Sequence, residues 1–196
     1  MRLDIQGLRA IAVGIVVLFH AWPKRLSGGY VGVDVFFVIS GFLISAHLLA
    51  ASPRTFTDLG TFWARRIRRL LPASLLVLTA TLVLSRLLAP ASAWRATARE
   101  VINAALYVEN WALAGKAVDY LAADGPETPA QHFWSLSVEE QFYLVWPLLI
   151  AAATLLALRL RRSPAQLVLV GFATVFVVSL YASITLTSTA PARAYF

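Results

Sequence analysis

Two ionisable side chains, Arg9 and His20, lie in the apolar segment LRAIAVGIVVLFHAW at residues 8–22. A helix turns about 100° and rises about 1.5 Å per residue, so it would place both on one stripe, about 16 Å apart along its axis. Ionisable groups inside a membrane span are costly and usually face a protein interior or a water-filled cavity. His20 could then serve as a general base. The alternative is a topology anchor at Arg9 and an interfacial polar residue at His20.

Two carboxylates stand at the start of other apolar segments. Asp34 lies in GGYVGVDVFFVISGFLIS and Glu139 in HFWSLSVEEQFYLVWP. Either could orient a histidine base or stabilise its imidazolium, and the sequence does not decide between them. For Asp34 the alternative is a carboxylate favoured by the helix macrodipole. Ser137 and Glu140 have the spacing of a capping box, which explains Glu140 but leaves Glu139 without a structural role.

Two arginines could hold a phosphorylated cofactor. Arg66 and Arg69, in FWARRIRRLLP, would share a helix face at the i and i+3 positions. Guanidinium forks match phosphate oxygens, so this pair could bind a cofactor from the cytosol. The alternative is a positive anchor beside the membrane or a contact with anionic lipid.

Two further candidates, His132 and Trp134, precede the apolar part of the fourth segment. An aromatic ring there could line a sugar site, although interfacial aromatic residues are common in membrane proteins. We therefore name His132 and Trp134 as candidate substrate-binding residues.

The elements that must position these side chains are membrane helices. Of the 196 residues, 59% are hydrophobic and 14% are charged, and the mean hydropathy is +0.72, which is unusual for a soluble domain. Five segments approach or exceed the length that crosses about 30 Å of hydrocarbon. They are residues 8–22, 31–50, 71–89, 138–158 and 165–187. The sequence therefore predicts an all-α, polytopic transmembrane helix bundle with no removable signal peptide.

The cations predict the orientation of this bundle. The net charge is +7, and the clusters RRIRR and RLRR both fall on the side of the N-terminus, which the positive-inside rule places in the cytoplasm. This distribution argues for a bilayer partner and against nucleic acid. His20, Asp34 and Glu139 would then lie at the outer face, and Arg9 with residues 65–69 at the inner face. Pro72 would begin the third span, and residues 90–136 would form an outer excursion that includes the loop DYLAADGPETPAQ.

Four stretches carry a family resemblance: DIQGLRAIAVGIVVLFH, GGYVGVDVFFVISGFLI, FWARRIRRLLPA and HFWSLSVEEQFYLVWPLL. In their order and spacing they resemble the acyltransferase-3 family of bacterial integral-membrane O-acyltransferases. The family modifies surface polysaccharides, peptidoglycan, lipids and some antibiotics. Its arginine–ten residues–histidine pair falls here on Arg9 and His20, while Gln6 stands where many members have Asp. The family core has about ten spans, so residues 1–196 resemble its N-terminal half.

The resemblance implies a multi-pass enzyme of the bacterial cytoplasmic membrane. Its donor would be acyl-CoA, with acetyl-CoA expected, and its acceptor a hydroxyl of an envelope glycan, peptidoglycan or lipid. Arg9, Arg66 and Arg69 would hold the CoA phosphates, His20 would take the acceptor proton, and no metal would be needed. An acyl-histidine intermediate is the variant route. The rival functions are a secondary transporter and a non-catalytic membrane assembly protein.

Overall fold

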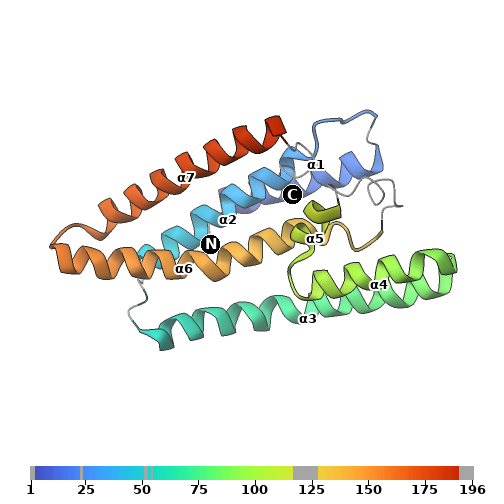
Figure 1. Cartoon of the computed structure of the whole chain (residues 1–196), viewed down its shortest axis with the longest axis horizontal. Coiled ribbons are helices and arrows are strands. Elements are labelled where there is room, and N and C mark those ends of the chain that lie inside the picture. The colour runs from blue at the N-terminus through green and yellow to red at the C-terminus, as the bar shows by residue number, and fades with distance from the viewer. Residues whose placement is uncertain (1–2, 23, 51–52, 54, 117–127, 190–196) are drawn as a thin grey trace. The chain divides into compact units, whose positions relative to one another are not determined.

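The computed structural model describes residues 3–22, 24–50, 53, 55–116 and 128–189. Within these residues the chain forms seven α-helices and no strand (Figure 1). The helices are α1 (Leu3–Ala21), α2 (Val31–Ala50), α3 (Phe56–Leu88), α4 (Ala91–Ala105), α5 (Glu109–Lys116), α6 (Phe133–Leu160) and α7 (Pro164–Thr189). The chain divides into two compact units, Met1–Ser52 and Pro53–Phe196.

Five of these helices are long and apolar enough to cross a membrane, namely α1, α2, α3, α6 and α7. The predicted all-α, multi-pass architecture is therefore confirmed. Most large apolar side chains on these helices are exposed, and on α7 the only buried residue among those described is Val168. Such surfaces suit contact with lipid tails or with further helices rather than with water.

The third span differs from its prediction. It begins at Phe56 rather than at residue 71, because Thr55 caps the helix: its side chain accepts from the backbone of Asp58, whose carboxylate accepts from the Thr55 backbone. The arginine cluster at 65–69 consequently lies within α3, as the predicted shared helix face of Arg66 and Arg69 requires. Pro72 lies in the interior of α3 and not in its first turn.

The predicted capping box at Ser137 is wrong. Helix α6 starts at Phe133, so Ser137 lies one turn inside it and donates to the Phe133 carbonyl oxygen at 3.0 Å. The predicted excursion at 90–136 contains α4 and α5. The loop predicted at 119–131 lies outside the described residues except for 128–131.

Helices α1 and α2 of the first unit pack closely through glycine. A Cβ atom on Gly29 would lie 2.3 Å from the Cβ of Phe19. One on Gly32 would lie 2.6 Å from the carbonyl oxygen of Ala12 and 2.7 Å from a methyl carbon of Val16. Glycine therefore sets how near α2 approaches the part of α1 that ends in His20.

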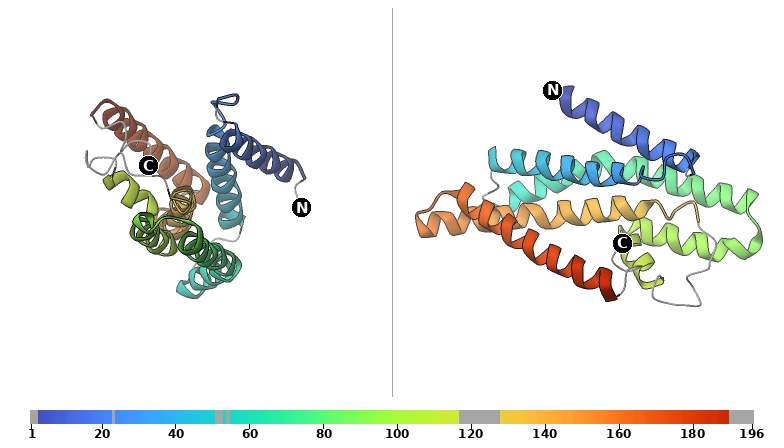
Figure 2. Two further views of the ribbon diagram at one scale, coloured as in Figure 1. Left: turned by 90° about the vertical axis from the view of Figure 1, so that its right-hand side faces the viewer. Right: turned by 90° about the horizontal axis from the view of Figure 1, so that it is seen from above.

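In the second unit, α4 folds back along α3, and α6 and α7 form a second helix pair (Figures 1 and 2). The short helix α5 packs against α6. Helices α3 and α5 thus both contact α6 near its start, where Glu139 and Glu140 lie.

Candidate active site

His20 occupies the last turn of α1 and is exposed. Its Nδ1 atom lies 2.8 Å from the carbonyl oxygen of Val16, one turn earlier. A carbonyl oxygen can only accept, so Nδ1 carries the proton of the neutral ring. The basic lone pair then belongs to Nε2, the tautomer that a proton-accepting histidine needs. The ring of Phe19 packs edge-on against the imidazole at a centroid distance of 5.2 Å.

Asp34 lies in the first turn of α2 and is exposed. Within the described part of the first unit, the structure records no hydrogen bond or ion pair for its carboxylate. The group that orients Nδ1 of His20 is the backbone carbonyl of Val16 instead. A partnership between Asp34 and His20 therefore stays a prediction.

Arg9 shares α1 with His20, as the predicted stripe requires. Its guanidinium carbon lies 5.9 Å from the centroid of the Phe36 ring on α2, a cation–π contact between the two helices. The side chain is half-buried.

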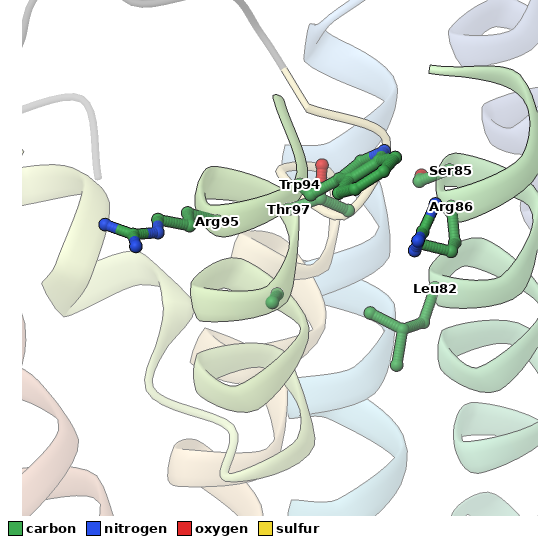
Figure 3. Close-up of a pocket in the computed structure, with 7 residues that line it drawn as sticks. Leu82, Ser85, Arg86, Trp94, Arg95 and Thr97 are labelled. Carbon is green, nitrogen blue, oxygen red and sulfur yellow. The ribbon is translucent and has the colours of Figure 1, made fainter. Parts of the chain in front are cut away.

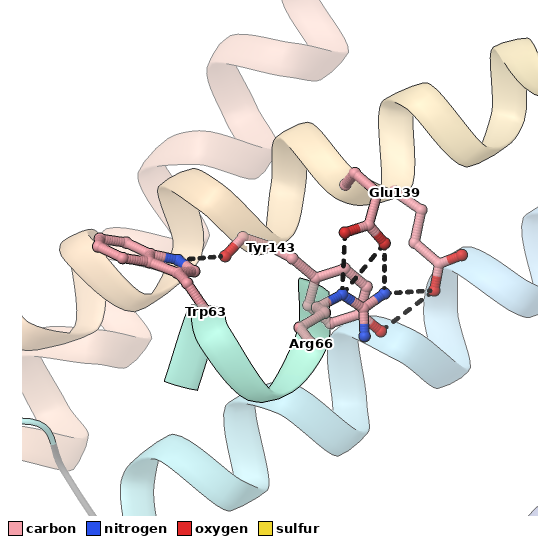
Figure 4. A network of polar contacts seen from close by, with 5 residues as sticks. Trp63, Arg66, Glu139 and Tyr143 are labelled. Carbon is pink, nitrogen blue, oxygen red and sulfur yellow. Dashed lines mark hydrogen bonds and ion pairs between the residues drawn. The ribbon is translucent and has the colours of Figure 1, made fainter. Parts of the chain in front are cut away.

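The second unit contains the densest ionic cluster among the described residues (Figure 4). Arg66 on α3 donates from Nε to both carboxylate oxygens of Glu140 at 3.1 Å, and from Nη2 to one of them at 2.7 Å. Its Nη2 also lies 3.6 Å from Glu139. Arg66 and Glu139 are predicted to lie at opposite membrane faces, and this contact contradicts that prediction.

Aromatic residues complete the surroundings of the same arginine. The guanidinium carbon of Arg66 lies 3.0 Å from the centroid of the Tyr143 ring. The Tyr143 hydroxyl donates to Glu139 at 3.1 Å, and the Trp63 indole donates to the Tyr143 carbonyl at 3.2 Å. The side chains of Arg66, Glu139 and Glu140 are 19%, 23% and 16% exposed, respectively, so the cluster is largely withdrawn from solvent.

Arg66 and Arg69, which are predicted to bind a phosphorylated cofactor together, have different surroundings in the structure. Two carboxylates surround the Arg66 guanidinium, and its fork is engaged by Glu140. Binding a phosphate there would require exchange of a buried ion pair, which is costly. Arg69 is exposed and has no carboxylate partner among the described residues.

A polar network beside this cluster escaped the sequence analysis. Gln141, next to Glu140, donates to the Tyr107 carbonyl at 2.8 Å and to the side chain of Asn110 at 2.9 Å. The Trp111 indole donates to Gln141 at 3.0 Å. Tyr107 has a φ of 55°, a left-handed backbone that a non-glycine residue rarely adopts. The sequence offers one indication of this link between α5 and α6, namely that Gln141 is a polar residue at the edge of an apolar run.

The remaining candidates, His132 and Trp134, lie at the start of α6. The carbonyl oxygen of His132 accepts from the Ser135 hydroxyl at 3.4 Å. His132 is exposed and Trp134 is half-buried. Their role in substrate binding stays a prediction.

Comparison with known proteins gives the family. Residues 2–196 match the family described as an acyltransferase domain. The chain belongs to this acyltransferase-3 family. It is 43% identical over 147 residues to the O-acetyltransferase OatA of Staphylococcus aureus (strain NCTC 8325 / PS 47), covering 74% of this chain and 24% of the relative. It is 38% identical over 147 residues to the putative peptidoglycan O-acetyltransferase YrhL of Bacillus subtilis (strain 168), covering 74% and 23%.

A putative O-acetyltransferase of Staphylococcus aureus (strain COL) is 40% identical over 152 residues, which is 77% of this chain and 25% of the relative. The chain thus spans about a quarter of the length of the curated relatives it matches. No solved structure matches it. Membership of the family confirms the resemblance carried by the four sequence stretches.

Proposed function

We propose that the protein containing this chain transfers an acyl group, expected to be acetyl, from acyl-CoA to a hydroxyl of an acceptor outside the cytoplasm. The observation that carries the proposal is the 2.8 Å bond from Nδ1 of His20 to the Val16 carbonyl, because it leaves Nε2 as the base. The names of the relatives, O-acetyltransferases, support the reaction class. The name of the Bacillus relative makes peptidoglycan the first acceptor to test.

The proposed reaction needs one proton acceptor. Nε2 of His20 takes the hydroxyl proton as the acceptor oxygen attacks the thioester carbonyl carbon. The carbon–sulfur bond then breaks, and the imidazolium returns the proton to the departing CoA thiolate. In the variant route Nε2 itself attacks the thioester carbon and expels the CoA thiolate, which leaves an acyl-histidine. The acceptor oxygen then attacks the acyl carbon, the bond to Nε2 breaks, and the acceptor proton passes to the thiolate.

The donor is proposed to enter from the cytoplasmic face, where the N-terminus is also placed. This assignment is supported by the arginine clusters at residues 65–69, in the first half of α3, and 159–162, at the C-terminal end of α6. Arg69 and Arg9 are assigned to the CoA phosphates, because guanidinium forks suit phosphate oxygens. Arg66 is assigned to the junction of α3 and α6, where Glu140 holds it.

The test uses the full-length protein in vesicles of either orientation, supplied with acetyl-CoA labelled in the acetyl group. Label should reach a glycan hydroxyl only when acetyl-CoA is offered to the cytoplasmic face. Transfer from the opposite face would overturn the donor side. Uptake of a solute without any transfer of label would replace the enzyme by a transporter, and neither activity would favour an assembly role.

A further inference from the structure

A cavity of about 460 Å³ lies between the end of α3 and the first half of α4, within the second unit (Figure 3). Most of its lining is apolar, including Leu82, Ala98 and the indole of Trp94. Its polar residues are Ser85, Arg86, Arg95 and Thr97. This combination of apolar wall and few polar groups is typical of a ligand site.

The Arg86 guanidinium packs against the ring of Trp94. Its guanidinium carbon lies 3.5 Å from the centroid of the Trp94 ring. The Trp94 indole donates to the Ala89 carbonyl at 3.1 Å, which fixes the ring of this α4 residue against the turn that joins α3 to α4. Stacking covers one face of a guanidinium but leaves the N–H groups at its edge able to donate. Figure 3 shows the Arg86 guanidinium beside the Trp94 ring, with Ser85 near both.

The charge of Arg86 has no anionic partner here. Among the described residues, no carboxylate pairs with Arg86. Arg95 also lines the cavity, but its guanidinium points away from Arg86 in Figure 3. The site therefore offers one preorganised fork to an anion, and phosphate oxygens match such a fork.

The surroundings of Arg86 indicate what carries that anion. Three leucines around it on α3 are largely exposed: Leu84 at 53%, Leu87 at 73% and Leu88 at 80%. These side chains belong to a helix apolar enough to span a membrane, whereas α4 beside it exposes Arg95 and Arg99. An apolar helix surface that meets an arginine-bearing one marks the boundary between hydrocarbon and head groups.

We infer that this cavity binds the phosphate head group of a membrane lipid at the end of α3. The lipid phosphate accepts hydrogen bonds from the edge of Arg86 and from Ser85, and the first carbons of its chains lie on Leu82 and Ala98. The inference is independent of the acyl-transfer proposal, because it uses neither His20 nor the Arg66 cluster.

The test is lipid binding to the purified full-length protein in detergent, followed by native mass spectrometry. The probes are a phosphatidylglycerol, the diacylglycerol with the same chains, and inorganic phosphate. Phosphatidylglycerol should bind about tenfold more tightly than diacylglycerol, as one bidentate charge-assisted contact warrants. Arg86→Gln should remove that advantage and leave diacylglycerol binding unchanged.

The matched control is Arg99→Gln, which changes the same charge on α4 but does not line the cavity. It should leave phosphatidylglycerol binding within about twofold, since an exposed charge contributes little. If Arg86→Gln does not fold, Arg86→Lys keeps a cation over Trp94 while losing the fork, and should lose most of the advantage.

Three results would overturn the inference. Equal losses for Arg86→Gln and Arg99→Gln would make the effect one of general surface charge. Equal binding of diacylglycerol and phosphatidylglycerol would make the cavity an apolar groove. Displacement of phosphatidylglycerol by inorganic phosphate at millimolar concentration would make free phosphate the ligand.

Discussion

The two units hold their ionisable residues in different ways. In the first, His20 is exposed and the bond from its ring to the Val16 carbonyl is local, spanning one helical turn. In the second, Arg66 is bound by two carboxylates and an aromatic ring, with its partners on α6 more than seventy residues away. The first arrangement keeps the proposed base, His20, on an exposed side chain, and the second joins two helices. We therefore expect changes in the first unit to act on catalysis and changes in the second to act on stability.

The largest expected effect is on catalysis in the first unit. His20→Gln keeps a hydrogen-bonding side chain but cannot take a proton near neutral pH, so acyl transfer by the full-length protein should fall about 10²–10⁴-fold. The thermal midpoint in detergent should hardly change, because His20 is exposed. His47→Gln, at the other exposed histidine of this unit, is the matched control and should keep full activity. Substantial activity of the His20→Gln variant would show that His20 is not the general base.

The next effect is on stability in the second unit. Glu140→Gln removes the closer carboxylate and leaves Arg66 with Glu139 at 3.6 Å. Breaking a fully buried pair costs about 3–5 kcal/mol, and we expect about 3 kcal/mol or less here because the Arg66–Glu140 pair is only partly buried and Glu139 remains. Glu139→Gln should cost clearly less, since its contact is longer. Thermal unfolding in detergent measures both, and an equal cost for the two variants would mean that the carboxylates share Arg66 evenly.

The third expected effect concerns Glu109, a buried carboxylate of the second unit that lies outside the membrane spans. Glu109 in α5 is fully buried, and neither of its oxygens has a hydrogen-bond partner among the described residues. Burial, reinforced by Glu100 and opposed by Lys116, raises the pKa of Glu109 from 4.5 to about 7. Nearby Glu100 is satisfied instead, by Lys116 and by the Thr128 hydroxyl.

The sign of the pH effect follows from this raised pKa. Below pH 4.5 Glu109 is protonated in both the folded and the unfolded chain, and it costs nothing. Between pH 4.5 and about 7 only the unfolded chain ionises, so stability falls as pH rises, and above about 7 the loss is constant. Glu109→Gln should lack this decline and should be more stable than the parent at pH 8, by about 3 kcal/mol. Thermal midpoints measured from pH 4 to 8 give the comparison, and parallel curves for the two proteins would contradict it.

The sequence predicts the helices better than their long-range partners. The second span was predicted at its observed bounds, because an apolar run ends in polar residues on both sides. The start of α3 cannot be read from hydropathy, since residues 56–70 are too polar for a span and the helix begins at the Thr55 cap. Glu140 was assigned to a local cap at Ser137, although its partner Arg66 lies on another helix. Local spacing cannot reveal a contact that only the packing of α3 on α6 creates.

The smallest expected effect concerns the glycines of the first unit and distinguishes close packing of α1 on α2 from the helix propensity of the residue. Gly32→Ala would place a Cβ 2.6 Å from the backbone of Ala12, so α1 and α2 must move apart, at a cost of about 1–2 kcal/mol. Because the same Cβ would press on Val16, whose carbonyl holds His20, acyl transfer should also fall. Gly14→Ala on α1 is the matched control: no atom lies within 4 Å of its added Cβ, and alanine favours a helix by about 0.5–1 kcal/mol. Thermal unfolding and acyl transfer measured together distinguish the outcomes. If Gly32→Ala lost stability but kept full activity, glycine packing would support the fold without positioning the base, and the catalytic role of the first unit would rest on His20 alone.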